Sequence, residues 1–311
     1  MTTTTTTTSA AATSTSVAIV PVTNHLRERL RNSRDFSVSV CIPCRNEAAT
    51  VASIVGPIRE QLMVPGNNLV DELLVFDDGS VDATAQVARS AGAGVISVGD
   101  VLPGEPPGRG KGNAMWCSVA ASTGDVIVWC DGDLISFTPA YVERLLVPFL
   151  DAQVAFVKGF YDRPTDASGE GGGRNTELVA RPLFSLLFPE LASVRQPLGG
   201  EYAARRSLLE RVPFVQGYGV EVGLLVDACQ LVGLSSLAQV DLGVRRHRHR
   251  PLLDLAPQAL EIMHTVLGRA GVTSLPDSPV LLQPNRSPRT VQIADRPPLI
   301  SVEEYVGNKR A

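Results

Sequence analysis

Short apolar segments rich in β-branched residues alternate with helical segments through the first half of this chain. Strands are expected at residues 38–43, 72–78, 94–98, 125–133 and 154–160, and helices at residues 24–34, 48–62, 81–91, 113–122 and 141–150. Strands that alternate with helices at this spacing form a mainly parallel sheet with helices on both faces. The pattern therefore predicts an α/β fold.

Polar residues gather where three of these strands end, at residues 43–47, 77–80 and 131–133. Ligands of open α/β sheets bind beyond the carboxyl ends of the strands. We therefore expect one binding site at this edge of the sheet.

Asp131 and Asp133 form a DGD motif directly after the apolar run VIVWC. Side chains at positions i and i+2 of an extended chain lie on the same face, so both carboxylates can approach one ligand. Mg²⁺ and Mn²⁺ prefer such oxygen ligands and usually keep substrate phosphates in their shell. A solvated acidic turn is the alternative, but the position at the end of a buried strand favours a metal that stabilises a leaving diphosphate.

The other two strand ends carry weaker signals. Asp78 lies in DDGS after the second strand, where an acidic residue suits recognition of ribose or base. The alternative there is an ordinary strand-to-helix turn with Ser80 as helix N-cap. Glu47 in PCRNE has a similar position after the first strand.

Two glycine-containing loops could hold anions. Lys111 in RGKGN opens a helix and could contact a diphosphate, although the loop is not a Walker A motif. Successive glycines before Arg174 and Thr176 let backbone N–H groups converge on a phosphate, which Arg174 can bind through two oxygens. Flexible surface loops remain the alternative at both places.

His247 and His249 lie among four arginines in RRHRHR, residues 245–250. This run could be a solvated basic patch. A neutral imidazole can also complete a metal site begun by carboxylates, while the arginines hold an acceptor phosphate or carboxylate.

Composition excludes several classes of protein. The net charge of -4 argues against broad nucleic-acid binding. No segment approaches the roughly 18 consecutive apolar residues of a membrane-spanning helix. Five cysteines, an odd number, exclude a complete disulfide framework and suit a structural role in a reducing cytoplasm.

The combination of PCRNE, FDDGS, GRGKGNAM, CDGD, GGGRNTELVARP, GGEYAARR, GYGVEVG and RRHRHRP resembles the actinobacterial glucosyl-3-phosphoglycerate synthases over about residues 24–270. GGGRNTELVARPL and GYGVEVG carry more specificity than the DGD motif alone. The resemblance implies a GT-A-like, Rossmann-type fold, a retaining transfer from UDP-glucose to 3-phosphoglycerate, a requirement for Mg²⁺ or Mn²⁺, and a homodimer.

The resemblance also assigns roles to single residues. Donor-nucleotide contacts are implied for Pro43, Glu47, Asp78, Lys111 and Asp131. Metal ligands are implied at Asp133 and His247, acceptor-phosphate contacts at Gly173, Arg174 and Thr176, and a carboxylate near the reacting sugar at Glu221. His249 stands where the family has Asn near the acceptor, which is a departure. We take Glu221 and Asp133 as the catalytic candidates.

These observations predict a cytoplasmic, metal-dependent retaining hexosyltransferase with no nucleic-acid or membrane partner. We divide it into a disordered Thr/Ser-rich tail (1–23), a nucleotide-sugar-binding half (24–160), a smaller acceptor-binding half of the same catalytic domain (161–270) and a peripheral or disordered C-terminal segment (271–311). The alternatives are a mannosyl-3-phosphoglycerate-type transferase, a nucleotidyltransferase on a similar sheet, and a non-catalytic nucleotide-sugar or nucleic-acid binding module.

Overall fold

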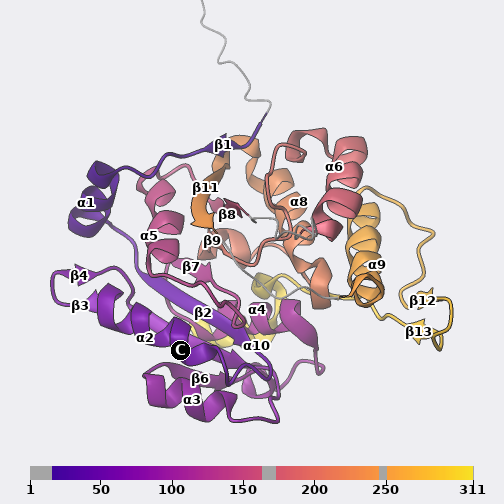
Figure 1. Ribbon diagram of the computed structural model, residues 1–311, viewed down its shortest axis with the longest axis horizontal. Helices are drawn as coiled ribbons and strands as arrows, with labels where there is room; N and C mark the ends of the chain where they lie inside the picture. The colour runs from indigo at the N-terminus through magenta and orange to yellow at the C-terminus, as the bar shows by residue number, and fades with distance from the viewer. Residues whose placement is uncertain (1–15, 163–172, 245–250, 311) are drawn as a thin grey trace, which may run out of the picture.

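A computed structural model describes residues 16–162, 173–244 and 251–310. Within these ranges, an eight-stranded sheet forms the centre of the molecule in the order β1-β11-β8-β9-β7-β2-β5-β6 (Figure 1). Its strands are β1 (Ala18–Ile19), β2 (Val38–Cys44), β5 (Glu72–Asp77), β6 (Gly94–Ser97), β7 (Val126–Trp129), β8 (Phe156–Asp162), β9 (Tyr202–Arg205) and β11 (Leu237–Val244). All pairings are parallel except those of β9 with β7 and β8. The mainly parallel sheet predicted from the sequence is confirmed.

Helices cover both faces of the sheet, because successive side chains of each strand point to opposite faces. In β2, Val40 and Ile42 pack on one face and Cys41 packs on the other. The first face carries α1 (Asn24–Ser33), α2 (Val51–Leu62), α3 (Thr84–Ala91) and α5 (Ala140–Leu146). The second carries α4 (Gly110–Ala121), α6 (Arg181–Leu187), α7 (Arg206–Leu209) and α8 (Val220–Val232). The helices thereby shield both faces of the sheet from solvent, as is typical of parallel sheets.

Some elements differ from the sequence-based expectation. The helix expected from residue 81 begins at Thr84, and Ser80 does not cap it. The strand β9 and the 18-residue helix α9 (Leu252–Arg269) were not foreseen. A π-helical segment, Thr176–Ala180, directly precedes α6.

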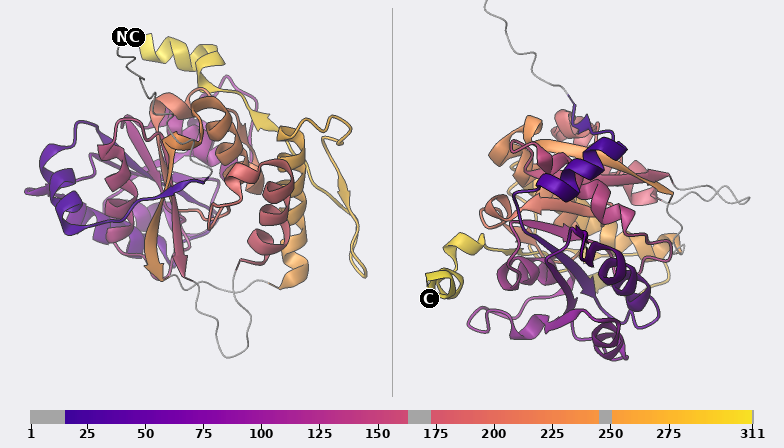
Figure 2. Two further views of the ribbon diagram at one scale, coloured as in Figure 1. Left: turned by 90° about the horizontal axis from the view of Figure 1, so that it is seen from above. Right: turned by 90° about the vertical axis from the view of Figure 1, so that its left-hand side faces the viewer.

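The segment from residue 271 was expected to be peripheral or disordered. Its described part contains β12 (Val280–Leu281) paired with β13 (Arg289–Thr290), which form an arm that projects beside α9 (Figures 1 and 2). The chain then returns to the body, where β14 (Asp295–Arg296) pairs with β10 (Phe214–Val215), and ends in α10 (Glu303–Arg310). The returning part packs on the face that carries α4 and α8, where Leu299 and Tyr305 join the core.

The cysteines are all free, and four of the five are buried. Burial raises the pKa of the Cys41 thiol to about 12, and it raises that of Cys44 as well. A buried thiol of such high pKa is a poor nucleophile, which fits the structural role expected for Cys41 and Cys44. Of the helices that the structure describes, none has the length and apolar character needed to cross a membrane.

Lys158 is a charged residue in the middle of the buried strand β8, with only 1% of its surface exposed. Its Nζ donates to the carbonyl oxygen of Gly199 at 2.5 Å and lies 4.0 Å from the ring centroid of Tyr202. Burial lowers the pKa of Lys158 to about 7, although the charge of Glu221 opposes this shift. Between that pH and about 10.4, the unfolded chain therefore binds one more proton at this site than the folded chain.

Replacing Lys158 with Met should remove this pH dependence. The free energy of unfolding of the wild type, relative to Lys158→Met, should rise between about pH 7 and about pH 9.5, because the unfolded state alone retains the proton there. Urea unfolding at both pH values measures the difference. Lys309→Met is the control. The pKa of Lys309 is raised above its usual value, so this side chain titrates above the pH range of the experiment. A difference between wild type and Lys158→Met that stays constant would contradict the assignment.

Candidate active site

The strand order brings the three acidic strand ends to one edge of the sheet. β2 lies between β7 and β5 and runs parallel to both, so the carboxyl ends of these three strands are neighbours. The loops after them carry Glu47, Asp78 and the pair Asp131 and Asp133. The single site predicted at this edge therefore has the required geometry.

Hydrogen bonds join the loop after β2 to the loop after β5. Asn46 has a positive φ of 60°, which Asn tolerates better than most residues. Its backbone N–H donates to Ser80 Oγ, and its Oδ1 accepts from the backbone N–H of Val81, both at 2.9 Å. The backbone N–H of Glu47 donates to Thr84 Oγ1 at 2.8 Å. Ser80 thus holds the neighbouring loop rather than capping α3.

The DGD turn packs tightly on the end of β2. A Cβ atom at Gly132 would lie 2.6 Å from Cys44 Sγ, so no larger residue fits there without movement. Thr50 Oγ1 donates to the carbonyl oxygen of Gly132 at 2.7 Å. This packing fixes the backbone between Asp131 and Asp133.

Negative charge is concentrated around this turn. Burial raises the pKa of the Glu47 carboxyl, and the charge of Asp133 raises it further. The carboxylates of Glu47, Asp77, Asp131 and Asp133 also add to the burial that raises the pKa of Cys44. Oxygen ligands of one sign at the end of a strand suit a hard divalent cation, so the residues present fit the predicted Mg²⁺ or Mn²⁺.

Lys111 connects the DGD turn to α8. Its Nζ donates to Asp131 Oδ1 at 2.6 Å and to Glu221 Oε1 at 2.7 Å. The side chains of Lys111, Asp131 and Glu221 are 19%, 21% and 6% exposed. Burial opposes the charge on Lys111, but the two carboxylates outweigh it and raise the pKa of the ammonium above its usual value. Lys111 therefore stays protonated across the physiological range.

The loop before Lys111 also contacts Asp78, which lies in the acidic loop after β5. The backbone of Gly110 donates a hydrogen bond to the carboxylate of Asp78. Burial raises the pKa of Asp78, whereas Arg45, with Nη1 3.8 Å from its Oδ2, lowers it. Pro43 lies on β2, where its register partner is Phe76 of β5. The structure thus gathers Glu47, Asp78, Lys111 and Asp131 at the edge of the sheet that also carries Pro43.

The predicted acceptor residues begin the helical stretch before α6. Gly173 has a φ of +96°, which favours glycine, and its carbonyl oxygen accepts from the backbone N–H of Glu177 at 3.0 Å. Thr176 is buried, and Arg174 is half-buried. π-Helical segments such as Thr176–Ala180 occur often at functional sites.

Helix α9 links these acceptor residues to the loop before Glu221. Asn175 Nδ2 donates to the carbonyl oxygen of Leu255 at 3.5 Å, and Glu261 Oε2 accepts from the backbone N–H of Tyr218 at 2.5 Å. Leu255 and Glu261 are six residues apart on one helix, which corresponds to about 9 Å. One rigid element therefore holds both parts of the candidate site.

His247 and His249 lie outside the described residues. The chain enters their segment from Val244, the last residue of β11, which runs in the same direction as β7. Within the described ranges, no three His, Cys, Asp or Glu side chains form a metal-binding group. Of the two predicted ligands, the structure places Asp133, which is exposed, and the pairing with His247 stays a prediction.

Sequence reasoning missed several residues that support the site. Helix α9 was not foreseen, although its apolar spacing over residues 252–266 was a usable signal. Lys158 and Glu201 are buried charges beside Tyr202, and the charge of Glu201 adds to the burial that raises the pKa of this tyrosine. A lysine inside the apolar run AFVKGF was the signal for the first of them.

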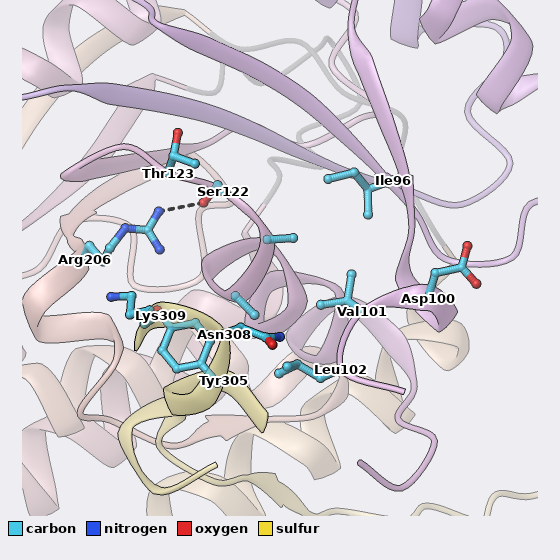
Figure 3. A pocket seen from close by; sticks show the side chains of 12 residues that line it. Ile96, Asp100, Val101, Leu102, Ser122, Thr123, Arg206, Tyr305, Asn308 and Lys309 are labelled. Carbon is cyan, nitrogen blue, oxygen red and sulfur yellow. Dashed lines mark hydrogen bonds between the residues drawn. The ribbon is translucent and has the colours of Figure 1, made fainter. Parts of the chain in front are cut away.

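A cavity of about 570 Å³ lies elsewhere, between the end of α4 and α10 (Figure 3). Arg206 Nη2 donates to Ser122 Oγ beside it, and Leu102 and Tyr305 also line it. Helix α4 has 12 residues, a length of about 18 Å, with Lys111 near its other end. This cavity is therefore separate from the candidate active site.

Comparison with known proteins agrees with this geometry. Residues 39–214 match the model of glycosyl transferase family 2. The chain is 49% identical to the glucosyl-3-phosphoglycerate synthase of Mycolicibacterium smegmatis over 86% of this chain and 90% of that protein. It is 44% identical to the enzyme of the same name from Mycobacterium tuberculosis, over 85% of each chain.

Solved structures of glucosyl-3-phosphoglycerate synthases also resemble this chain. A crystal structure of the Mycobacterium tuberculosis synthase in complex with Mn²⁺, UDP-glucose and phosphoglyceric acid superposes with a TM-score of 0.82 at 41% identity, covering 91% of this chain and 98% of that one. Another, with Mg²⁺ and UDP, gives a TM-score of 0.79 at 42% identity, covering 91% and 97%. The GT-A-like fold implied by the sequence motifs is confirmed, and the chain belongs to glycosyl transferase family 2 and, within it, to the glucosyl-3-phosphoglycerate synthases.

Proposed function

We propose that this chain transfers glucose from UDP-glucose to the 2-hydroxyl of 3-phosphoglycerate with retention, giving glucosyl-3-phosphoglycerate. The observation that carries this function is the Lys111 bridge between Asp131 and Glu221. It joins the edge of the sheet where a nucleoside diphosphate would bind to a carboxylate that suits a sugar or an acceptor hydroxyl. Relatives with this name cover most of the chain, and one of their crystal structures holds UDP, Mn²⁺ and the glucosylated product.

The donor would occupy the edge formed by the loops after β2, β5 and β7. We assign Pro43, Glu47 and Asp78 to its nucleoside and Lys111 and Asp131 to its diphosphate, because they gather at this edge. Asp133 would hold the Mg²⁺ or Mn²⁺, together with His247. The bound metal supplies a positive charge that stabilises the departing diphosphate.

The acceptor would lie between the start of the helical stretch at residue 173 and α8. Arg174, Thr176 and the backbone of Gly173 are proposed to bind its phosphate, and His249 to contact it nearby. Since α9 supports both this segment and the loop before Glu221, the acceptor phosphate and the reacting hydroxyl would be held at a fixed separation. Such positioning supplies much of the rate enhancement in reactions of two substrates.

The Lys111 bridge also bears on the route to retention. A double displacement needs a carboxylate nucleophile next to the anomeric carbon. Asp131 and Glu221 both accept hydrogen bonds from the Lys111 ammonium, which lowers their nucleophilicity. We therefore propose a front-face transfer through an oxocarbenium-like ion pair, in which Glu221 orients the acceptor hydroxyl.

The function is tested by incubating the chain with 3-phosphoglycerate, Mn²⁺ and a panel of nucleotide-sugars, followed by mass analysis. We expect a phosphorylated hexoside from UDP-glucose, and a loss of turnover of about 10²-fold or more in Asp133→Ala because the metal loses a ligand. Asp100→Ala, an exposed carboxylate at the separate cavity, is the control. Wild-type turnover by Asp133→Ala at saturating metal would remove Asp133 from the metal site. Pyrophosphate release from a nucleoside triphosphate would instead indicate a nucleotidyltransferase.

Replacing Arg174 with Ala should chiefly raise the KM for 3-phosphoglycerate, by about tenfold or more, because a charge-assisted contact to phosphate is lost. The KM for UDP-glucose should change little. Initial-rate kinetics with each substrate varied in turn makes the measurement, with the exposed Arg211→Ala as control. An unchanged acceptor KM would place Arg174 outside the acceptor site.

A homodimer is the oligomeric state that the exposed apolar surface favours. Leu178 and Leu186 near α6 are 71% and 78% exposed, and Leu252 of the adjacent α9 is 60% exposed. Leu282, at the arm formed by β12 and β13, is 72% exposed. Exposed apolar side chains on neighbouring elements are typical of protein interfaces. Light scattering should give twice the chain mass of 33.1 kDa for the wild type and a lower mass for the Leu186→Glu variant. A wild-type protein that is monomeric in solution would exclude the dimer.

We further propose that the chain acts in the cytoplasm. Five free cysteines, four of them buried, suit a compartment that keeps thiols reduced.

A further inference from the structure

Residues 292–297, which we name the C-terminal strap, cross the molecule beside the start of α4. Within the strap, β14 pairs antiparallel with β10, and the backbone N–H of Gln216 donates to the carbonyl oxygen of Ala294 at 2.9 Å. Arg269 of α9 forms ion pairs with Asp295 of the strap and with Asp227 of α8, both at 2.8 Å. The strap is therefore anchored directly to β10 and α9, and Arg269 connects that contact to α8.

Arg296 connects the strap to α4, and only 7% of its surface is exposed. Its Nε donates to Asn113 Oδ1 at 2.7 Å, and its guanidinium carbon lies 4.9 Å from the ring centroid of Trp116. Trp116 Nε1 in turn donates to the carbonyl oxygen of Pro297 at 2.8 Å. Asn113 is two residues from Lys111 on the first turns of the same helix.

The loop before Lys111 meets the strap as well. A Cβ atom at Gly108 would lie 1.9 Å from Asn113 Oδ1 and 2.2 Å from Arg296 Nη2, so Gly108 lies directly on that hydrogen-bonded pair. The guanidinium of Arg109 donates to the carbonyl oxygen of Gln292. The strap thus contacts residues on both sides of Lys111.

This region of α4 needs outside support. Three of the five residues from 108 to 112 are glycines, which lose more conformational entropy on ordering than other residues. Gly110 has a φ of +71°, and no side chain caps the helix N-terminus. Lys111 must nevertheless hold its ammonium within hydrogen-bonding distance of both Asp131 and Glu221.

We infer that the C-terminal strap positions the donor site, with Arg296 as a positioning residue that fixes Lys111 through Asn113 and Trp116. The inference rests on the proposed function, because it takes the loop of residues 108–113 to contact the nucleotide-sugar. Loss of the strap contact should loosen this loop and weaken donor binding. The affinity for the acceptor should remain, because Gly173, Arg174 and Thr176, which are proposed to bind its phosphate, lie on another part of the chain.

Two variants break the contact in different ways. Arg296→Met removes the guanidinium and retains an unbranched side chain over Trp116. Gly108→Ala leaves every partner in place but inserts a methyl group between the loop and the pair of Asn113 and Arg296. Lys309→Met is the control for the first variant, because it removes a cation from α10, where Lys309 pairs with Glu210. Gly99→Ala is the control for the second, since a Cβ atom there meets nothing closer than 3.8 Å.

Calorimetry with UDP and Mn²⁺ and initial-rate kinetics measure the effect. Arg296→Met and Gly108→Ala should each raise the Kd for UDP and the KM for UDP-glucose about fivefold or more, with the acceptor KM unchanged within about twofold. The controls should match the wild type. If both test variants remain folded and bind UDP as the wild type does, the inference is wrong. If Arg296→Met does not fold, Gly108→Ala alone decides.

Hydrogen exchange separates this inference from the proposed function. In the chain without ligand, backbone amides of residues 108–116 should exchange faster in Arg296→Met and Gly108→Ala than in the wild type, because the loop has lost an anchor. A wild type that binds no UDP would overturn the proposed function, and the exchange rates would still decide whether the strap holds the loop. Unchanged exchange in both test variants would overturn the strap inference.

Discussion

The candidate site depends on one ammonium group that lies between two carboxylates of different elements. Lys111 comes from the start of α4, Asp131 from the end of β7 and Glu221 from the first turn of α8. One positive charge against two negative charges leaves a net negative site, which a divalent cation and a diphosphate can complete. The same bridge joins the proposed donor edge of the sheet to α8, which is proposed to face the acceptor. Removal of Lys111 would take a charged hydrogen-bond partner from two partly buried carboxylates.

Contacts from several parts of the chain hold these three groups in place. The sheet order puts the ends of β7, β2 and β5 side by side, and hydrogen bonds of Asn46 with Ser80 and Val81 join two of their loops. Helix α9 supports both the proposed acceptor segment and the loop before Glu221. The C-terminal strap reaches α4 from the opposite end of the sequence. Precise placement of reacting groups requires this kind of rigid support.

Much of the first half was predictable, because strand and helix periodicities are local properties of the sequence. The strands over residues 38–44 and 72–77 and the helices over residues 51–62 and 110–121 were expected within a few residues. β9 was missed because YAAR has no strong strand pattern, and it is stabilised only by its neighbours β7 and β8. The role of Arg296 was also missed, since its partners Asn113 and Trp116 are about 180 residues away in the sequence.

The sequence by itself determined the fold class, the family and the residue types of the site, because motifs such as CDGD and GYGVE combine a local chemistry with a local backbone. Only the tertiary structure decided which of these residues meet. The ion pairs of Lys111 cross 20 and 110 residues of chain, and the contact of Arg296 with Asn113 crosses 183. Contacts of that range depend on how strands are ordered and how helices pack, and no local pattern of residues records either.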